Sequence, residues 1–565
     1  MSYVHANETA QEMRSPDTVM RLARLGSAFP TRLSFGRSLI RRLIEDGSTV
    51  ERRLWSIDER GFGRAVYRVE IGGHAYSLVA FATALADEDR SDRVIAEAWD
   101  ASFALYDGDP ETADLDRLEA NLPKQEAGRY TDRELVISRS NKSVRLFSHV
   151  ADALAQGQQP DIDMVDSIGY LMRTTAVYGN GKFGIADRFV FADRPGLQGP
   201  FAAEMLTVWL IRTFTHDLVE HVARMRGGDS AVRLDPEIKR HLGIGNSTGL
   251  GMAPFLVYHP ELIHNWLHAR ETALARVRAL SEVTTETAHR LRALFNRARA
   301  HVEHWQVPDA LQAERLVTLR AELEQAVDSA PLDCAGPYPI KALMDWSDQH
   351  SLECQELIRA LCLEPFGDLI DELTDEMAFN AKPQFLPGMS LVELSGLIDQ
   401  HYHWCGGVNF ETTIASQKFW YVSEAKLEPR LGDRYAEDGA DREQPLDVAR
   451  QVQSLCVAIA GVDQDDARVC DLLARHPEHR NIVKRVQSSA QRPFAEIRDN
   501  LIDQSMRPID MLRCKLAFFG AVKFDPKSDL WTRITLFQGA PMCDGRRHCA
   551  LPQRPVLVVM LVVGW

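Results

Sequence analysis

Residues 243–251 carry the clearest chemical signal in the chain, because four glycines surround an Asn-Ser-Thr triplet. Glycine costs backbone entropy, so such a cluster indicates a tight turn or a close approach to a ligand. Freed backbone N–H groups beside short polar side chains form sites for phosphate or carboxylate groups. We predict that the Ser247 hydroxyl takes part in catalysis. The predicted substrate-binding residues are Gly245, Asn246, Thr248 and Gly249.

This segment does not match the dinucleotide-binding fingerprint Gly-x-Gly-x-x-Gly. Thr248 stands at the position of the third glycine, and residues 235–241 before it have a helical pattern instead of a strand pattern. A plain connecting loop is the alternative interpretation, since clusters of glycine, asparagine and serine mark loops.

A second segment, Tyr178-Gly-Asn-Gly-Lys182, places a lysine on a tight turn. It is not a P-loop, because Ala176 and Phe183 replace the required glycine and hydroxyl residue. A partly desolvated lysine can act as an acid or a base, so we predict that Tyr178 and Lys182 are catalytic. The alternative is a helix end followed by an Asn-Gly turn. The predicted substrate-binding residues here are Asn180, Gly181 and Arg188.

A third segment covers residues 405–411. Asn409 and Glu411 alternate, so on a strand they would face the same side, and we predict that both bind substrate. The alternative is a pair of solvated polar residues. Cys405 beside paired glycines is expected to be a buried thiol, because no base that would activate it is visible.

No metal site is predicted, and the sequence identifies no cofactor. The histidines at 216 and 221 do not have the spacing of His-Glu-x-x-His, and His264 with His268 lacks a third ligand. The stripe formed by Arg212, His216, Glu220 and Arg224 on one predicted helix is expected to be a solvated row of ion pairs.

The hypothesis is that the three segments converge on one cleft that binds a small anionic substrate, a carboxylate or a phosphate ester. Lyase- or isomerase-like acid–base chemistry would follow, with backbone N–H groups holding the developing negative charge. Two alternatives stay open. One is a nucleotide- or flavin-dependent enzyme that uses residues 243–251, and the other is a helical binding or scaffold protein without catalysis.

An α+β fold that is predominantly α-helical is expected to position these segments. Residues 64–81 predict two strands joined at Gly72-Gly73, and Leu54–Ile57 adds a third, which gives a small N-terminal hairpin or meander unit. A large multi-helix body is expected to follow. Its predicted helices include Ser91–Leu105, Asp161–Tyr178, Pro200–Met225, Pro260–Trp305 and Pro308–Val327.

Length and charge limit the classes of function. A chain of 565 residues predicts several domains, here 1–160 (α+β), 161–440 (helical with glycine-rich loops) and 441–565 (helical). A net charge of −15 argues against nucleic acid or an anionic membrane as a partner. Scattered cysteines and the absence of a signal peptide or long apolar run favour a soluble, cytoplasmic protein with reduced thiols. Together with the three segments, this predicts a cytoplasmic enzyme of small-molecule metabolism. A homo-oligomer is left open.

Overall fold

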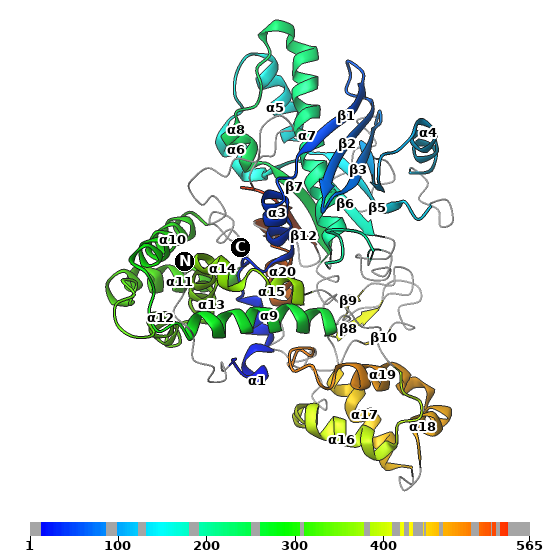
Figure 1. Cartoon of the computed structure of the whole chain (residues 1–565), viewed down its shortest axis with the longest axis vertical. Helices are drawn as coiled ribbons and strands as arrows, with labels where there is room; N and C mark the ends of the chain where they lie inside the picture. The colour runs from blue at the N-terminus through cyan, green and yellow to red at the C-terminus, as the bar shows by residue number, and fades with distance from the viewer. Residues whose placement is uncertain are drawn as a thin grey trace. The chain divides into compact units, whose positions relative to one another are not determined.

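Two compact units make up the chain. The computed structural model describes residues 13–85, 99–122, 131–179, 191, 193–199, 201–249, 260–305, 310–377, 385–409, 419–422, 429–432, 444–445, 448–462, 467–498, 508–520, 523–526 and 531–540. We call Met1–Ala28, Gly249–Ala288 and Gln325–Lys515 the helical unit. We call Phe29–Thr248, His289–Glu324 and Leu516–Trp565 the sheet unit. Each unit therefore combines stretches that are far apart in the sequence (Figure 1).

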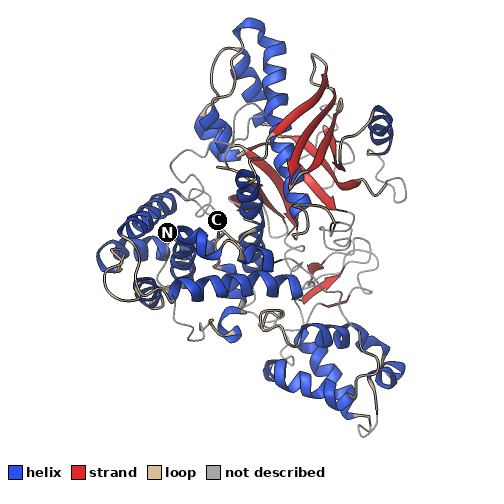
Figure 2. Ribbon diagram, in the orientation of Figure 1, coloured by secondary structure: helices blue, strands red, loops and turns tan. Residues whose placement is uncertain are grey.

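A nine-stranded sheet is the centre of the sheet unit, with the strand order β1-β2-β3-β4-β5-β6-β7-β12-β11 (Figure 2). The first six strands pair antiparallel in chain order. β6 and β7 pair in parallel, and β12 and β11 pair antiparallel. The strands are Val50–Ile57 (β1), Gly63–Ile71 (β2), His74–Ala82 (β3), Ala101–Asp107 (β4), Glu134–Lys142 (β5), Tyr170–Gly179 (β6), Gly243–Gly249 (β7), Lys523–Pro526 (β11) and Trp531–Leu536 (β12).

The hairpin of β2 and β3 confirms the turn predicted at Gly72-Gly73. Ile71 pairs with His74, so the turn has two residues. A two-residue turn of this kind needs positive φ at both positions, and the φ angles of Gly72 and Gly73 are 57° and 76°.

Helices cover both faces of the sheet. Val66 of β2 packs in a buried cluster with Leu115 and Leu118 of α4 (Thr112–Asn121). The next residue, Tyr67, points to the opposite face, where its ring meets the edge of Phe214 on α7 (Ala202–Gly227). Strands that are buried on both faces have nearly continuous apolar sequences, and β3 and β4 are examples.

The longest described helix, α7, contacts the sheet along β3 to β6 and also packs against α5 (Figure 1). The other helices of the sheet unit are α3 (Phe35–Glu45), α5 (Leu146–Ala155), α6 (Ile162–Ile168) and α8 (Pro236–His241). Three helices have residues in both units: α10 (Thr285–His304), α11 (Ala310–Ser329) and α20 (Pro508–Phe519).

The helical unit is organised around α9 (Pro260–Arg278), which contacts four helices between α12 and α15. A second group joins α16, α17 and α19, and β10-β8-β9 form a small sheet. The elements of this unit are α1 (Pro16–Val19), α2 (Leu22–Gly26), α12 (Pro339–Ser347), α13 (Leu352–Leu363), α14 (Gly367–Ile370), α15 (Leu373–Glu376), α16 (Leu391–His401), β8 (Phe419–Val422), β9 (Pro429–Gly432), β10 (Gln444–Pro445), α17 (Val448–Ala460), α18 (Val469–Arg475) and α19 (Arg480–Ser489).

The large sheet corrects the predicted fold class, in which strands formed only a small N-terminal hairpin or meander. The helix predicted over Asp161–Tyr178 is α6 followed by β6, because Gly169 ends α6 in the left-handed conformation. β4 occupies the end of the helix predicted to reach Leu105. The physical reason is that a strand buried on both faces cannot be distinguished from a buried helix by apolar periodicity. Helices still form most of the described secondary structure.

The domain division into 1–160, 161–440 and 441–565 stays a prediction, since compactness does not show which parts fold alone. Within the described residues, no helix combines the length and the apolarity that crossing a membrane requires.

Candidate functional site

Two of the three predicted loop segments begin on neighbouring strands. Tyr178 lies in β6, opposite Ile137 of β5, and residues 243–249 form β7 instead of a loop. β6 and β7 run in parallel, with Thr174 beside Asn246, so their carboxyl ends reach the same edge of the sheet. Ser247, Thr248 and Gly249 are the last residues of β7. The predicted site residues that lie outside the described residues are Asn180, Gly181, Lys182, Arg188 and Glu411.

The glycines of β7 have a packing role. A Cβ atom at Gly245 would lie 2.6 Å from the ring of Tyr170, and one at Gly243 would lie 2.2 Å from the carbonyl oxygen of Leu536. Asn246 donates from Nδ2 to the Thr174 hydroxyl (3.0 Å), which donates to the Gly245 carbonyl (3.3 Å). The glycines at 243 and 245 therefore let β7 fit closely against its neighbouring strands. From the sequence alone, these glycines were instead explained by the close approach of a ligand.

The third segment belongs to the helical unit. Asn409 is exposed and follows the 3₁₀ turn His403–Gly407. Cys405 in this turn is buried, as predicted. Gln453 Nε2 donates to the carbonyl oxygens of Cys405 and Val408, both at 2.8 Å. These bonds fix the backbone before Asn409 against α17.

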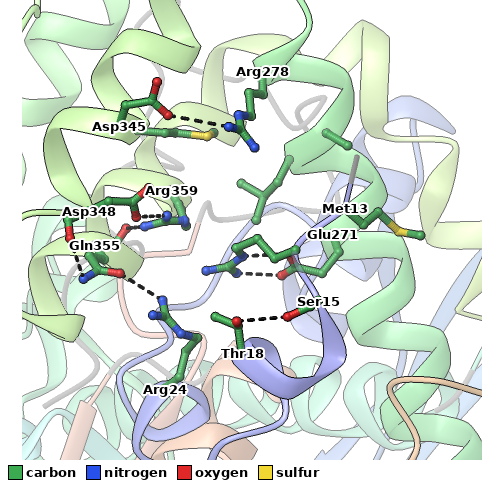
Figure 3. Close-up of a pocket in the computed structure, with 14 residues that line it drawn as sticks. Met13, Ser15, Thr18, Arg24, Glu271, Arg278, Asp345, Asp348, Gln355 and Arg359 are labelled. Atoms are coloured by element: carbon green, nitrogen blue, oxygen red, sulfur yellow. Dashed lines mark hydrogen bonds and ion pairs between the residues drawn. The ribbon is translucent and has the colours of Figure 1, made fainter. Parts of the chain in front are cut away.

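A pocket of about 410 Å³ in the helical unit was missed by the sequence interpretation (Figure 3). Four arginines contribute to its lining: Arg14 before α1, Arg24 on α2, Arg278 at the end of α9 and Arg359 on α13. Figure 3 shows Arg24, Arg278 and Arg359 arranged around the pocket. The volume is in the range of small-molecule sites.

Glu356 does not line the pocket, but it is completely buried and contacts two of the lining arginines. It accepts hydrogen bonds from Arg14 Nη1 (2.6 Å), from Arg24 Nη1 (2.9 Å) and from Arg270. Burial alone would raise the pKa of Glu356, but the charges of Arg14, Arg270 and Arg359 outweigh it and hold the pKa well below its usual range. Glu356 is therefore an anion that anchors the arginine cluster.

Arg14 is held on two sides. Its Nε and Nη2 donate to both carboxylate oxygens of Glu271 on α9, at 2.8 and 2.7 Å. Two parallel bonds of this kind fix the orientation of the guanidinium plane. Arg14 therefore lines the pocket as an immobilised side chain.

Arg24 and Arg278 are held less completely. Among the described residues, Arg24 uses only Nη1, which donates to Gln355 as well as to Glu356. Burial lowers the pKa of Arg24, partly against the attraction of Glu356. Arg278 is 38% exposed in its side chain and lies 3.6 Å from Asp345. Both guanidinium groups keep N–H donors for a ligand. Leu274, Ala275 and Met344 supply apolar lining.

Glu204, in the first turn of α7, is a second residue that the sequence interpretation missed. Its side chain is buried, and Oε1 has no hydrogen-bond partner among the described residues. Burial raises the pKa of Glu204 to about 7, so it can exchange a proton near neutral pH. The available signal was an acidic residue inside the apolar run Ala202-Ala-Glu-Met-Leu206.

The expected solvated stripe on α7 is wrong at two of its four positions. Arg212 and His216 are each only 2% exposed. Arg212 Nε donates to the carbonyl oxygen of Leu242 (2.7 Å), just before β7. Burial, and then the charges of Arg212 and Lys239, lowers the pKa of His216, which keeps it neutral. Arg212 and His216 therefore belong to the packing between α7 and the sheet, whereas Arg224 is exposed.

Comparison of the chain with protein-family models, with curated proteins and with solved structures finds no match.

Proposed function

We propose that this protein binds a small organic anion in the arginine-lined pocket of the helical unit. The observation that supports the proposal best is the balance of charge. Four arginines (Arg14, Arg24, Arg278 and Arg359) line the pocket, whereas the carboxylates in the lining are Glu271, Asp345 and Asp348. Outside the lining, the buried Glu356 is offset by Arg270. One bound negative charge would balance this group.

The lining also limits the ligand class. Guanidinium groups pair best with planar carboxylates and with phosphate oxygens. The apolar side chains of Leu274, Ala275 and Met344 favour a ligand with a short hydrocarbon part beside its anionic group. The proposed ligand class is therefore a carboxylate or phosphate ester. The same class is predicted from the sequence, but at the glycine-rich segments instead of this pocket.

Native mass spectrometry of the purified protein, followed by calorimetry with the anion identified or with short-chain carboxylates and alkyl phosphates, tests this proposal. Arg278→Gln is expected to weaken binding by about 10- to 100-fold, because a hydrogen bond to a charged group contributes ~1.5–3 kcal/mol. Arg290→Gln, an exposed arginine outside the pocket, is the matched control and should bind like the wild type. Equal affinity of Arg278→Gln and wild type would reject the pocket as the site.

A second candidate function is acid–base catalysis at the sheet edge where β6 and β7 end, with Tyr178, Lys182 and Ser247 in the catalytic roles. The parallel pairing of the two strands favours it, because ligands in α/β sheets often bind beyond the carboxyl ends of parallel strands. The same experiment separates the two sites. An anion that is lost from Lys182→Ala but retained by Arg278→Gln would favour the sheet edge.

The nucleotide- or flavin-dependent alternative is tested by the absorbance spectrum of the purified protein and by the mass of any bound nucleotide. A preparation in which neither a ligand nor a chromophore is found would favour the binding or scaffold alternative.

A further inference from the structure

A short turn in the helical unit brings three potential metal ligands together. The sequence His476-Pro-Glu-His479 connects α18 (Val469–Arg475) to α19 (Arg480–Ser489) through the 3₁₀ turn Pro477–His479. The His476 N–H donates to the carbonyl oxygen of Leu472 (2.8 Å), and the His479 N–H donates to that of His476 (3.2 Å). Both histidines are therefore held by backbone bonds at the junction of two helices.

Two of the distances in this cluster are close to those of a tetrahedral ion site. His476 Nδ1 lies 3.2 Å from Glu478 Oε1, and His479 Nε2 lies 3.8 Å from the same oxygen. All three atoms lie within 4.8 Å of one another. Bonds of ~2.0–2.1 Å to a tetrahedral zinc ion would separate neighbouring ligand atoms by about 3.3–3.4 Å. The two distances to Glu478 Oε1 are close to that separation. The two histidines offer nitrogens within 4.8 Å of each other, so a side-chain rotation that brings them closer would complete the coordination.

The ligand chemistry selects the type of ion. Two imidazole nitrogens and one carboxylate oxygen suit zinc and its neighbours in the first transition row, whereas magnesium and calcium prefer oxygen ligands alone. His479 is nearly buried and His476 is 39% exposed, so one side of the cluster is open to water. Such an opening leaves a fourth position for a water molecule.

We propose that His476, Glu478 and His479 bind one divalent transition-metal ion, with zinc as the best match, and leave a fourth position for water. The simpler interpretation is a surface ion pair between Glu478 and two histidines. The two interpretations differ in a measurable way, because only a metal site gives a stoichiometric complex with a defined coordination geometry.

Calorimetric titration of the full chain with zinc chloride, and visible absorption of its cobalt(II) complex, test the proposal. The wild type should bind one zinc ion that magnesium does not displace, and its cobalt complex should show the intense bands of tetrahedral coordination. His476→Ala and Glu478→Gln should each weaken this binding more than about tenfold, since even groups that only support metal ligands are worth that much.

His289→Ala, an exposed histidine on α10, is the matched control and should retain the site. His479→Ala should also lose the site. Because the His479 side chain is buried, this variant could fail to fold, and in that case the variants at the exposed positions 476 and 478 test the proposal. Full affinity and unchanged cobalt bands in His476→Ala would overturn the proposal. Zinc bound only by exposed thiols such as Cys456 or Cys470 would give that result.

Discussion

Glu204 is a carboxyl group that the folded sheet unit removes from water without a hydrogen-bond partner for Oε1 among the described residues. Burial disfavours its charged form and raises the pKa from 4.5 to about 7. Between these two pH values the folded protein holds a proton that the unfolded chain releases. The free energy of unfolding therefore decreases as the pH rises through this window.

We predict that Glu204→Gln removes this pH dependence. A shift from 4.5 to about 7 corresponds to about 3 kcal/mol at most, so the variant should gain up to that much stability relative to the wild type between pH 5 and pH 8. Denaturant unfolding of both proteins at the two pH values measures the difference. Glu237→Gln, at an exposed position on α8, is the control. A difference between variant and wild type that does not change with pH would contradict the prediction.

At the scale of elements, β7 depends on two glycines for its place in the sheet. It joins the six consecutive strands to the C-terminal strands, and its glycines leave room for Tyr170 on one side and Leu536 on the other. A methyl group at either glycine would have to displace a ring or a backbone atom.

Gly245→Ala should therefore destabilise the sheet unit by ~1–3 kcal/mol, the usual cost of overpacking. The matched substitution Gly396→Ala lies within α16, where an added Cβ meets no atom within 4 Å, and it should stabilise the helical unit by ~0.5–1 kcal/mol. Amide hydrogen exchange in β6 and α16 reports the two effects separately. The packing role of Gly245 would be refuted if its alanine variant left exchange in β6 unchanged.

The elements that were predictable from the sequence are those whose partners are close in the chain. The β2–β3 hairpin needs only the Gly72-Gly73 turn between two apolar stretches. The role of Gly243 depends on Leu536, whose proximity no local pattern reveals. The pocket could not be predicted for the same reason. Arg14 does not stand out in the sequence, and its role depends on Glu271 and Glu356, which only the fold brings beside it. Glu204 differs, since an acidic residue within an apolar run was a visible and unused signal.

At the scale of the whole molecule, the N-terminal stretch is an integral part of the helical unit. Arg14 contacts Glu271 and Glu356, which are 257 and 342 residues later in the sequence. Glu271 and Glu356 are almost completely buried, so each depends on its arginine partners to offset the loss of hydration.

Arg14→Gln should consequently destabilise the helical unit by ~3–5 kcal/mol, because the buried Glu271 loses its bidentate partner while Glu356 keeps Arg24 and Arg270. Faster amide hydrogen exchange in α9 and α13 is the expected observation. Arg60→Gln, whose side chain is 78% exposed and 3.6 Å from Asp58, should change stability by less than ~1 kcal/mol. Protection of α9 and α13 that is the same in Arg14→Gln and wild type would show that these carboxylates do not need Arg14.

The position of β12 beside β7 also sets an order of events during synthesis on the ribosome. β7 leaves the ribosome early, whereas residues 250–530 must be made before β12 can cover its free edge. At 5–20 residues per second this interval lasts roughly 15–55 seconds. An uncovered strand edge is a template for pairing with other chains. The nascent sheet unit is thus expected to be a client of chaperones until its final strands arrive.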